Sequence, residues 1–411
     1  MSNTLRDIIN RTNQCLLPKL SRPYYDCEFH VEYQLRENML KLHFDELILC
    51  LAEADFNQPS KITSKVSSSI LILYLELQSE SSCKLENSKA KECSLKLNST
   101  FNDKFKFLES LDKMMESNNF DGQEIFDKSL NELHSRLTIE DLNKYPGLIE
   151  VYCVLMKNIK NYKVTLNPPA VLPISLILIE DYVGVNKIKG LQSCLSILQC
   201  LAPTDFSNGN YYEVVYSSLK KNIVEKDIQV TKYSIECVLA LLNILPLHVK
   251  NNKLDDIFSI TLDQLNTESN LYRKAECFLF VTKLIQMHGI HCVKKKVFKS
   301  IICDNLDICA DVTIQGILLQ HTIECFQTWI KYCWPVWKLP FDQRLLSSLL
   351  KVLYLCDVDA LKLQIQNVIV ILISLCTKEE QTQICESLEM APECTNSLLL
   401  KSIGTIKQNL K

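Results

Sequence analysis

The stretch EDYVGVNKIKG, residues 180–190, decides the fold, because it ends one apolar run and begins an amphipathic one. The run before it, residues 174–179, is almost wholly aliphatic, and a short turn at Gly184 follows. From Asn186 onward, apolar residues recur at three- and four-residue spacing, which predicts a helix with a single apolar stripe. The members of that stripe are Ile188, Leu191, Leu195, Leu198 and Leu201.

Two more amphipathic segments follow directly, one after Asp205 and one after Asp227. Each aspartate stands where an N-cap side chain accepts a hydrogen bond from an otherwise unpaired backbone N–H. The succession of helix, tight turn and helix is typical of an α-solenoid, and it extends from residue 174 to residue 245.

The same pattern recurs along the chain, with a cysteine at a similar place in each unit. These cysteines are Cys153, Cys194, Cys237, Cys277 and Cys325. Their intervals of 41, 43, 40 and 48 residues match the roughly 40–47 residues of HEAT and armadillo repeats. A small apolar thiol tolerates burial and lets facing helices approach closely. No stretch shows the sustained alternation of a β-strand, so the sequence predicts an all-α, HEAT/armadillo-like α-solenoid of paired antiparallel helices.

The composition changes once. Residues 79–103 are rich in Ser, Lys, Glu and Asn, with few apolar side chains to bury. We therefore predict an N-terminal helical region over residues 1–78, a flexible or disordered insert over 79–103, and a HEAT-like helical-repeat region over 104–411.

Composition also narrows the class of protein. The chain has 411 residues, of which 47% are hydrophobic and 23% charged, as in an ordinary soluble protein. A formal net charge of −3 disfavours a surface that binds nucleic acid along its whole length. Nineteen cysteines without a secretory signal indicate reduced thiols, and no apolar stretch reaches the roughly 20 residues of a membrane span. The expected location is therefore the cytoplasm and the nucleus.

Motifs that carry chemistry are missing from the sequence. His288, His291 and Cys292 form the one cluster that resembles metal ligands, but zinc sites need three or four ligands at recognisable spacing. Nothing matches a phosphate-binding loop, a dinucleotide fingerprint, a nucleophile elbow or a kinase motif. We expect no catalytic residue, no metal and no cofactor, and we expect that the protein is not an enzyme.

Two features leave alternatives open. Gly190 lies inside a predicted helix, where Gly costs about 1 kcal/mol relative to Ala, so it serves either close helix packing or binding. The three tryptophans of the chain lie within nine residues, which fits either core packing or an interface anchor. The candidate residues for a partner interface or a repeat junction are Asp181, Tyr182, Asn186, Lys187, Gly190, Trp329, Trp334, Pro335 and Trp337.

The segment around residue 180 resembles the Tel-two-interacting protein two family, the smallest subunit of the Triple-T co-chaperone complex. The matching features are the apolar run into residues 180–182, the pattern Asn186-Lys187-x-x-Gly190, and the string EVVY at 213–216. A second match is the Trp334-Pro335 helix end. The resemblance covers about residues 145–340 and hardly touches the N-terminal part.

This resemblance implies a non-catalytic HEAT-like scaffold that binds the large HEAT-repeat subunit of the Triple-T complex directly, with the Tel-two protein as third member. It also implies an indirect link to the ninety-kilodalton heat-shock chaperone and its R-two-T-P adaptor. The clients would be phosphatidylinositol-3-kinase-related kinases, whose folding, stability and assembly the complex supports. Neither nucleic acid nor a membrane is expected as a partner.

Two other classes stay open. A generic HEAT or armadillo adaptor, such as a nuclear-transport or phosphatase regulatory subunit, would share the repeat pattern, although the crowding of all three tryptophans into one unit disfavours a cargo groove of the armadillo type. An enzyme that depends on a thiol or a metal is the third class. The sequence does not decide which helices contact which partner, or the stoichiometry.

Overall fold

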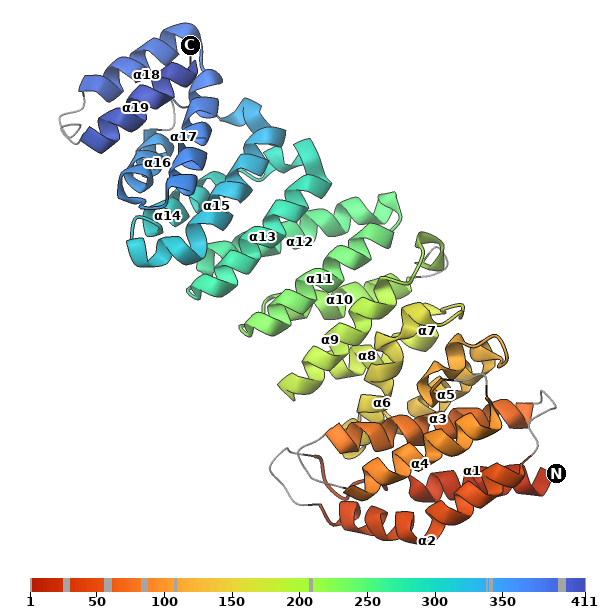
Figure 1. Ribbon diagram of the computed structural model, residues 1–411. Helices are drawn as coiled ribbons and strands as arrows, with labels where there is room; N and C mark the ends of the chain where they lie inside the picture. The colour runs from red at the N-terminus through yellow and green to blue at the C-terminus, as the bar shows by residue number, and fades with distance from the viewer. Residues whose placement is uncertain are drawn as a thin grey trace. The chain divides into compact units, whose positions relative to one another are not determined.

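The computed structural model describes residues 2–24, 30–54, 61–82, 88–106, 109–206, 210–337, 339, 343–390 and 397–410. These residues form helices and turns, and none of them lies in a β-strand (Figure 1). The chain divides into two compact units, one of residues 1–219 with 236–244 and one of residues 220–235 with 245–411. The boundary between the two units therefore falls within two helices. It does not coincide with either end of the predicted 79–103 insert.

The first unit is built from helices of 4 to 23 residues. They are α1 (Ser2–Cys15), α2 (Val31–Glu53), α3 (Lys61–Ser82), α4 (Ser88–Lys104), α5 (Gly122–Arg136), α6 (Pro146–Lys157), α7 (Pro168–Val171), α8 (Pro173–Ile179) and α9 (Gly184–Leu198). Short 3-10 turns lie between several of them: η1 (Leu111–Glu116), η2 (Leu142–Lys144), η3 (Ile159–Asn161) and η4 (Pro203–Phe206). Two helices contribute residues to both units, α10 (Tyr211–Ile223) and α11 (Ile228–Ile244).

The second unit continues in the same way. Its helices are α12 (Leu247–Thr267), α13 (Leu271–His288), α14 (Phe298–Ile308), α15 (Val312–Cys333), α16 (Gln343–Leu355), α17 (Asp359–Ser374), α18 (Lys378–Met390) and α19 (Ser397–Leu410). Two 3-10 turns belong to it, η5 (Gly289–Lys294) and η6 (Trp334–Val336). None of the described helices is both long enough and apolar enough to cross a bilayer.

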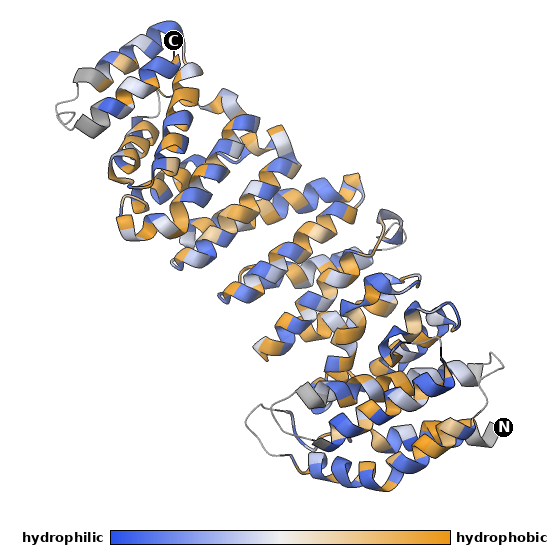
Figure 2. Cartoon of the chain, in the orientation of Figure 1, coloured by the Kyte–Doolittle hydropathy of each residue, from blue (hydrophilic) through white to orange (hydrophobic). Residues whose placement is uncertain are grey.

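Most helices bury one face and expose the other, so that apolar and polar residues divide along them (Figure 2), whereas residues 70–77 of α3 are all buried. Successive helices with short connections pack against each other, as α8 does with α9 and α12 with α13. Short connections between packed helices make the neighbours antiparallel. The predicted all-α, HEAT-like solenoid is confirmed.

The cysteine repeat has a structural basis. Its members lie on α6, α9, α11, α13 and α15. Four of them are buried, while Cys153 is half-buried. The Cys237 thiol donates to the Leu191 carbonyl at 3.2 Å, which brings α11 against α9. Within each unit the helix of one repeat packs on that of the next, as α6 does on α9 and α13 on α15.

Of the two predicted helix caps, one is wrong and the other is confirmed. Asp205 does not cap α10, because its carboxylate accepts from the Ala202 backbone N–H at 2.7 Å, within the turn that holds η4. Asp227 does cap α11, since it accepts from the Val230 N–H at 2.9 Å.

The predicted insert is also wrong for most of its length. Residues 79–82 complete α3 and residues 88–103 lie in α4, while 83–87 fall outside the described residues. The side chains of α4 at positions 90, 93, 97 and 101 are buried, and α4 packs against α2 and α3. The polar composition misled the prediction, because a few small and apolar residues at helical spacing suffice to hold a surface helix. The Lys104 ammonium also donates to the carbonyls of Leu51 and Ala52, at 2.9 and 3.0 Å, where α2 ends.

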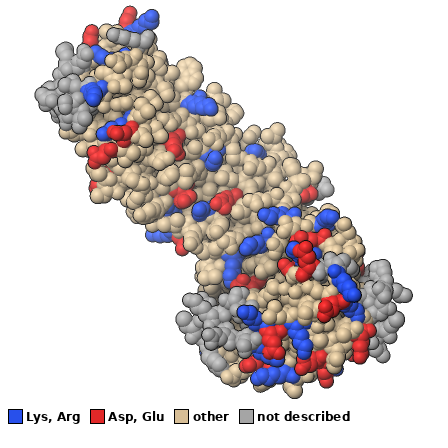
Figure 3. Space-filling view, viewed as in Figure 1, with Lys and Arg blue, Asp and Glu red and all other residues tan. Residues whose placement is uncertain are grey.

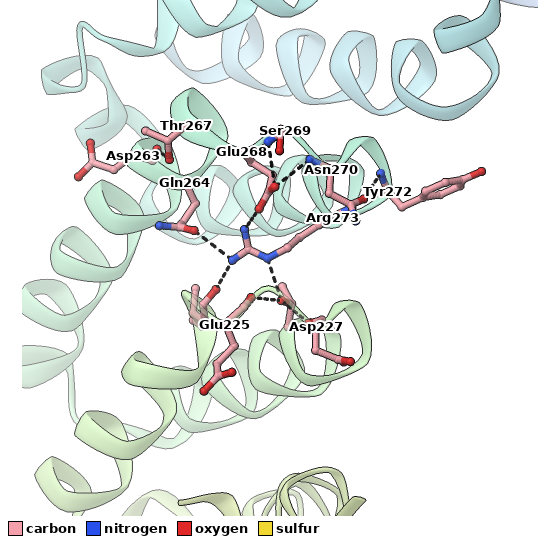
Figure 4. A network of polar contacts seen from close by, with 12 residues as sticks. Glu225, Asp227, Asp263, Gln264, Thr267, Glu268, Ser269, Asn270, Tyr272 and Arg273 are labelled. Atoms are coloured by element: carbon pink, nitrogen blue, oxygen red, sulfur yellow. Dashed lines mark hydrogen bonds and ion pairs between the residues drawn. The ribbon is translucent and has the colours of Figure 1, made fainter. Parts of the chain in front are cut away.

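A buried arginine ties four helices of the second unit together (Figure 4). The Arg273 guanidinium on α13 is 1% exposed and donates to the Ile223 carbonyl at the end of α10, at 2.7 Å. It also donates to Thr231 Oγ1 at 3.1 Å and to Gln264 Oε1 at 3.0 Å, and it forms an ion pair with Glu268. Carbonyls in the last turn of a helix lack a partner inside that helix, and Arg273 supplies one to α10.

Glu268 depends on the same arrangement. Its carboxylate accepts the backbone N–H groups of Ser269 and Asn270, both at 2.8 Å. Burial acts to raise its pKa, but the Asn270 N–H and the Arg273 charge outweigh burial, so the pKa of Glu268 is lowered.

We predict that Arg273→Met lowers the free energy of unfolding of the full chain by about 3–5 kcal/mol, because it leaves a carboxylate buried without its cation. Chemical denaturation followed by circular dichroism measures this. Arg344→Met is the matched control in the same unit. Arg344 is half-exposed and pairs with Asp304 and Asp307, so its loss costs about 0–1 kcal/mol. Equal denaturation midpoints for the two variants would contradict the role of Arg273 in holding these helices together.

Candidate protein-interaction site

The residues predicted to cluster around the Gly184 turn do so in part. Asp181 is buried just after α8, and Asn186 lies in the first turn of α9. The Asn186 amide donates to Asp181 Oδ2 and to Asn143 Oδ1, both at 2.8 Å. The Asn143 amide in turn donates to Asp181 Oδ1 at 3.2 Å. This closed triangle joins the η2 turn to the turn between α8 and α9.

Asn143 is the member that sequence reasoning missed. It lies 38 residues before Asp181, and no periodicity marks it. Its backbone carbonyl also accepts from the Tyr24 N–H at 2.8 Å, so the same residue holds the segment after α1. The pairing of an asparagine with a distant aspartate is a property of the tertiary structure.

Gly190 serves helix packing. A Cβ built on it would lie 2.7 Å from the Ile179 nitrogen and from Leu178 Cβ, and 2.8 Å from the Ser175 carbonyl oxygen. Real Cβ atoms do not approach backbone atoms that closely, so α9 and α8 meet at a distance that only glycine permits. This decides between the two roles left open for Gly190.

Tyr182, in contrast to Gly190, lies at the surface. Its side chain is 68% exposed and borders a surface pocket of about 420 Å³. Two further exposed apolar side chains line the same pocket, Ile139 at 83% and Val214 at 53%. They come from the loop after α5 and from α10, so three segments far apart in sequence meet here. Exposed apolar side chains grouped around a hollow are typical of a protein interface.

The charge of this pocket has one sign. Its remaining lining residues are Leu142, Asn143, Leu176, Ile177, Glu180, Asp181 and Ser218. Two carboxylates thus line it and no lysine or arginine does. An apolar side chain with a basic neighbour is the kind of group that complements such a pocket. Lys187, predicted as an interface residue, is half-buried in the first turn of α9 and does not line the pocket.

The tryptophan segment divides into buried and exposed parts. The Trp329 ring is buried and stacks on Phe298, with ring centroids 3.6 Å apart and planes 5° from parallel. Trp337 is buried and meets Phe326 edge to face at 4.8 Å. Trp334 is 55% exposed at the end of α15, and Pro335 beside it is exposed as well. Core packing therefore accounts for Trp329 and Trp337, whereas an interface role for the exposed Trp334 stays a prediction.

The histidine cluster has a structural explanation without a metal. His288 Nε2 lies 3.0 Å from Asp255 Oδ1, and Lys295 Nζ lies 3.3 Å from the same oxygen. Burial lowers the pKa of His288 in spite of the Asp255 carboxylate. Among the described residues, no three His, Cys, Asp or Glu side chains come together so that they could hold a metal ion.

Comparison with known proteins places the fold. No family model and no curated protein matches the chain. Solved structures do match. Kap95p, in a structure that describes its binding to RanGDP, is 11% identical with a TM-score of 0.51, over 92% of this chain and 48% of Kap95p. These likenesses show the fold alone.

Two further structures fall below a TM-score of 0.5. Importin beta is 10% identical with a TM-score of 0.48, over 97% of this chain and 47% of importin beta. An engineered protein is 10% identical with a TM-score of 0.45, over 98% of both chains. The chain spans about half the length of the two transport proteins. The likeness to Kap95p supports the helical-repeat fold and nothing more specific.

We predict that Gly190→Ala lowers the melting temperature of the full chain, because forcing α9 away from α8 costs about 1–3 kcal/mol. Differential scanning calorimetry measures the change. Gly184→Ala is the control at the start of the same helix, since a Cβ there meets nothing within 4 Å. A melting temperature that falls equally in both variants would show that the close approach is not the cause.

Proposed function

We propose that this protein is a non-catalytic helical-repeat scaffold that binds a partner protein through the pocket bordered by Ile139, Tyr182 and Val214. The observation that carries the proposal is the convergence of three exposed apolar side chains on one hollow. Aromatic side chains at the centre of such patches commonly supply most of the binding energy.

The scaffold supplies rigidity to this pocket. The Asp181 triangle fixes the turn that carries Tyr182, and the Gly190 contact locks α9 to α8 behind it. A side chain held on a fixed turn loses less conformational entropy on binding than one on a mobile loop. The pocket is therefore suited to a lasting contact with another protein.

We further propose, from the resemblance of residues 145–340, that the partner is the large HEAT-repeat subunit of the Triple-T complex. In that setting the protein acts with the Tel-two protein, the ninety-kilodalton heat-shock chaperone and its R-two-T-P adaptor. It would support folding and stability of phosphatidylinositol-3-kinase-related kinases in the cytoplasm and nucleus. The pocket falls inside the resembling region, apart from Ile139, Leu142 and Asn143 on one side of its rim.

The test is affinity purification of tagged full-length chain from cells, with the large subunit quantified by mass spectrometry. The double variant Ile139→Asp with Tyr182→Ala should reduce recovery of the large subunit about thirtyfold or more, the effect of losing about 2 kcal/mol at a hot spot. Its melting temperature should stay unchanged, because both side chains are exposed.

Leu247→Asp is the matched control, a leucine 77% exposed in the other unit. It should leave recovery unchanged. Full recovery by the double variant would exclude the pocket as the interface. Absence of the large subunit from the wild-type purification would refute the Triple-T assignment, and the partner that is recovered in its place would replace it.

A further inference from the structure

A second surface, in the other compact unit, has the opposite charge. It is formed by two segments, 289–299 and 329–337, which we call the basic–aromatic surface. The two segments and the residues that flank them in sequence contain no carboxylate side chain. Residues 277–303 and 325–341 include lysines but no Asp or Glu. None of its residues lines the Tyr182 pocket.

Two contacts and one close approach join the two segments. Trp329 stacks on Phe298 at 3.6 Å, and Lys299 Nζ lies 5.3 Å from the centroid of the Trp337 ring. A Cβ at Gly289 would lie 4.0 Å from Tyr332 Cδ1. Gly289 has φ +58°, a conformation that glycine adopts without strain, and this lets α13 end and η5 turn beside α15. The buried rings therefore form a fixed floor beneath what the segments expose.

The exposed residues on this floor are apolar or basic. Trp334 is 55% exposed, Ile290 64%, Val297 48% and Val336 45%. The exposed lysines are Lys294, Lys296 and Lys331. Lys295 is directed to Asp255 and Ser259, at 3.3 and 2.7 Å, and so it neutralises the carboxylate that packs nearest from α12. The surface thus combines an exposed tryptophan with three exposed lysines, Lys294, Lys296 and Lys331, that form no ion pair with the described residues.

On the face shown in Figure 3, by contrast, charges of both signs intermingle over the N-terminal helices. Several lysines of the N-terminal helices have carboxylate partners, such as Lys96 with Asp45 at 2.6 Å. A cluster of lysines without interspersed acids is therefore a local exception in a chain whose formal net charge is −3.

We propose that the basic–aromatic surface binds an acidic protein segment that carries aromatic or aliphatic anchors, with Trp334 as the central contact. Charge complementarity selects the partner, since lysines around an apolar patch favour Glu- and Asp-rich sequences and reject basic ones. The exposed tryptophan and the exposed lysines come from two short segments, which fits a short peptide better than the extended phosphate lattice of a nucleic acid.

The experiment pans a library of short random peptides against the immobilised full-length chain. The expected result is enrichment of peptides with net negative charge and aromatic or aliphatic residues. An enriched peptide, labelled with a fluorophore, should bind Trp334→Ala about thirtyfold more weakly than wild type, as for other hot-spot tryptophans. Lys296→Glu should weaken it about tenfold or more, and added salt should weaken wild-type binding.

Two control variants sharpen the test. Lys351→Glu makes the same change of charge at an exposed position on α16, and Tyr182→Ala removes the anchor of the other pocket; neither should change binding. This separates the inference from the proposed function, since each has its own variants. Enriched peptides that are basic, or that bind Trp334→Ala as tightly as wild type, would overturn the proposal, and so would a library without enrichment. A different outcome would identify a membrane as the partner. In that case no peptide is selected, wild type binds vesicles of about one-third phosphatidylserine, and Trp334→Ala and Lys296→Glu lose this binding.

Discussion

The need to satisfy polar groups where helices end governs this structure more than any other constraint. A solenoid of short helices has many ends, and each end leaves backbone N–H and C=O groups without partners in the helix. Several of these ends are buried against the next repeat, where an unpaired polar group is costly. In this protein a single buried polar side chain can bind groups from several helices. Arg273 binds the last carbonyl of α10 and also a side chain from each of α11 and α12.

The same solution recurs with different chemistry. Near the N-terminus the Arg36 guanidinium lies 3.0 Å from Glu76 Oε2, both nearly inaccessible to water, and that oxygen also accepts the Leu17 N–H at 3.1 Å. Around residue 180, two amides and a carboxylate close the triangle of Asn143, Asp181 and Asn186. The apolar stripes supply the driving force for stacking, while these junctions fix how one repeat meets the next, because a misplaced junction would leave its charge or amide unpaired.

The two exposed aromatic side chains of the proposed binding surfaces lie directly beside fixed, buried residues. Tyr182 follows Asp181 directly, and Trp334 follows the buried Cys333 at the end of α15. In both cases the buried neighbour holds the backbone while the next side chain is left exposed. The two surfaces differ in charge, since Glu180 and Asp181 line one and exposed lysines belong to the two segments that form the other. A scaffold with two such surfaces can distinguish its partners by charge without catalytic machinery.

The sequence by itself determined the helices and their repeat. Apolar stripes at helical spacing and cysteines about 40 residues apart are local patterns, and they predicted α9, α10 and α11 and the recurrence of similar units along the chain. Average composition failed over α4, where side chains at positions 90, 93, 97 and 101 are buried within an otherwise polar sequence. The role of Asp205 also depended on the tertiary structure, because its carboxylate accepts a hydrogen bond from the Ala202 backbone N–H and does not cap α10.

Only the tertiary structure decided the sites. The motif around residue 180 placed Asp181, Tyr182 and Asn186 near one another, but Ile139, Asn143 and Val214 join them through packing of α5, η2 and α10. Likewise, the crowding of three tryptophans did not reveal that Trp329 and Trp337 are buried while Trp334 is exposed. Helical periodicity reports which face of one helix is apolar, whereas a pocket is formed by residues from several helices. Its members are set by how those helices stack, and that is a property of contacts between segments distant in sequence.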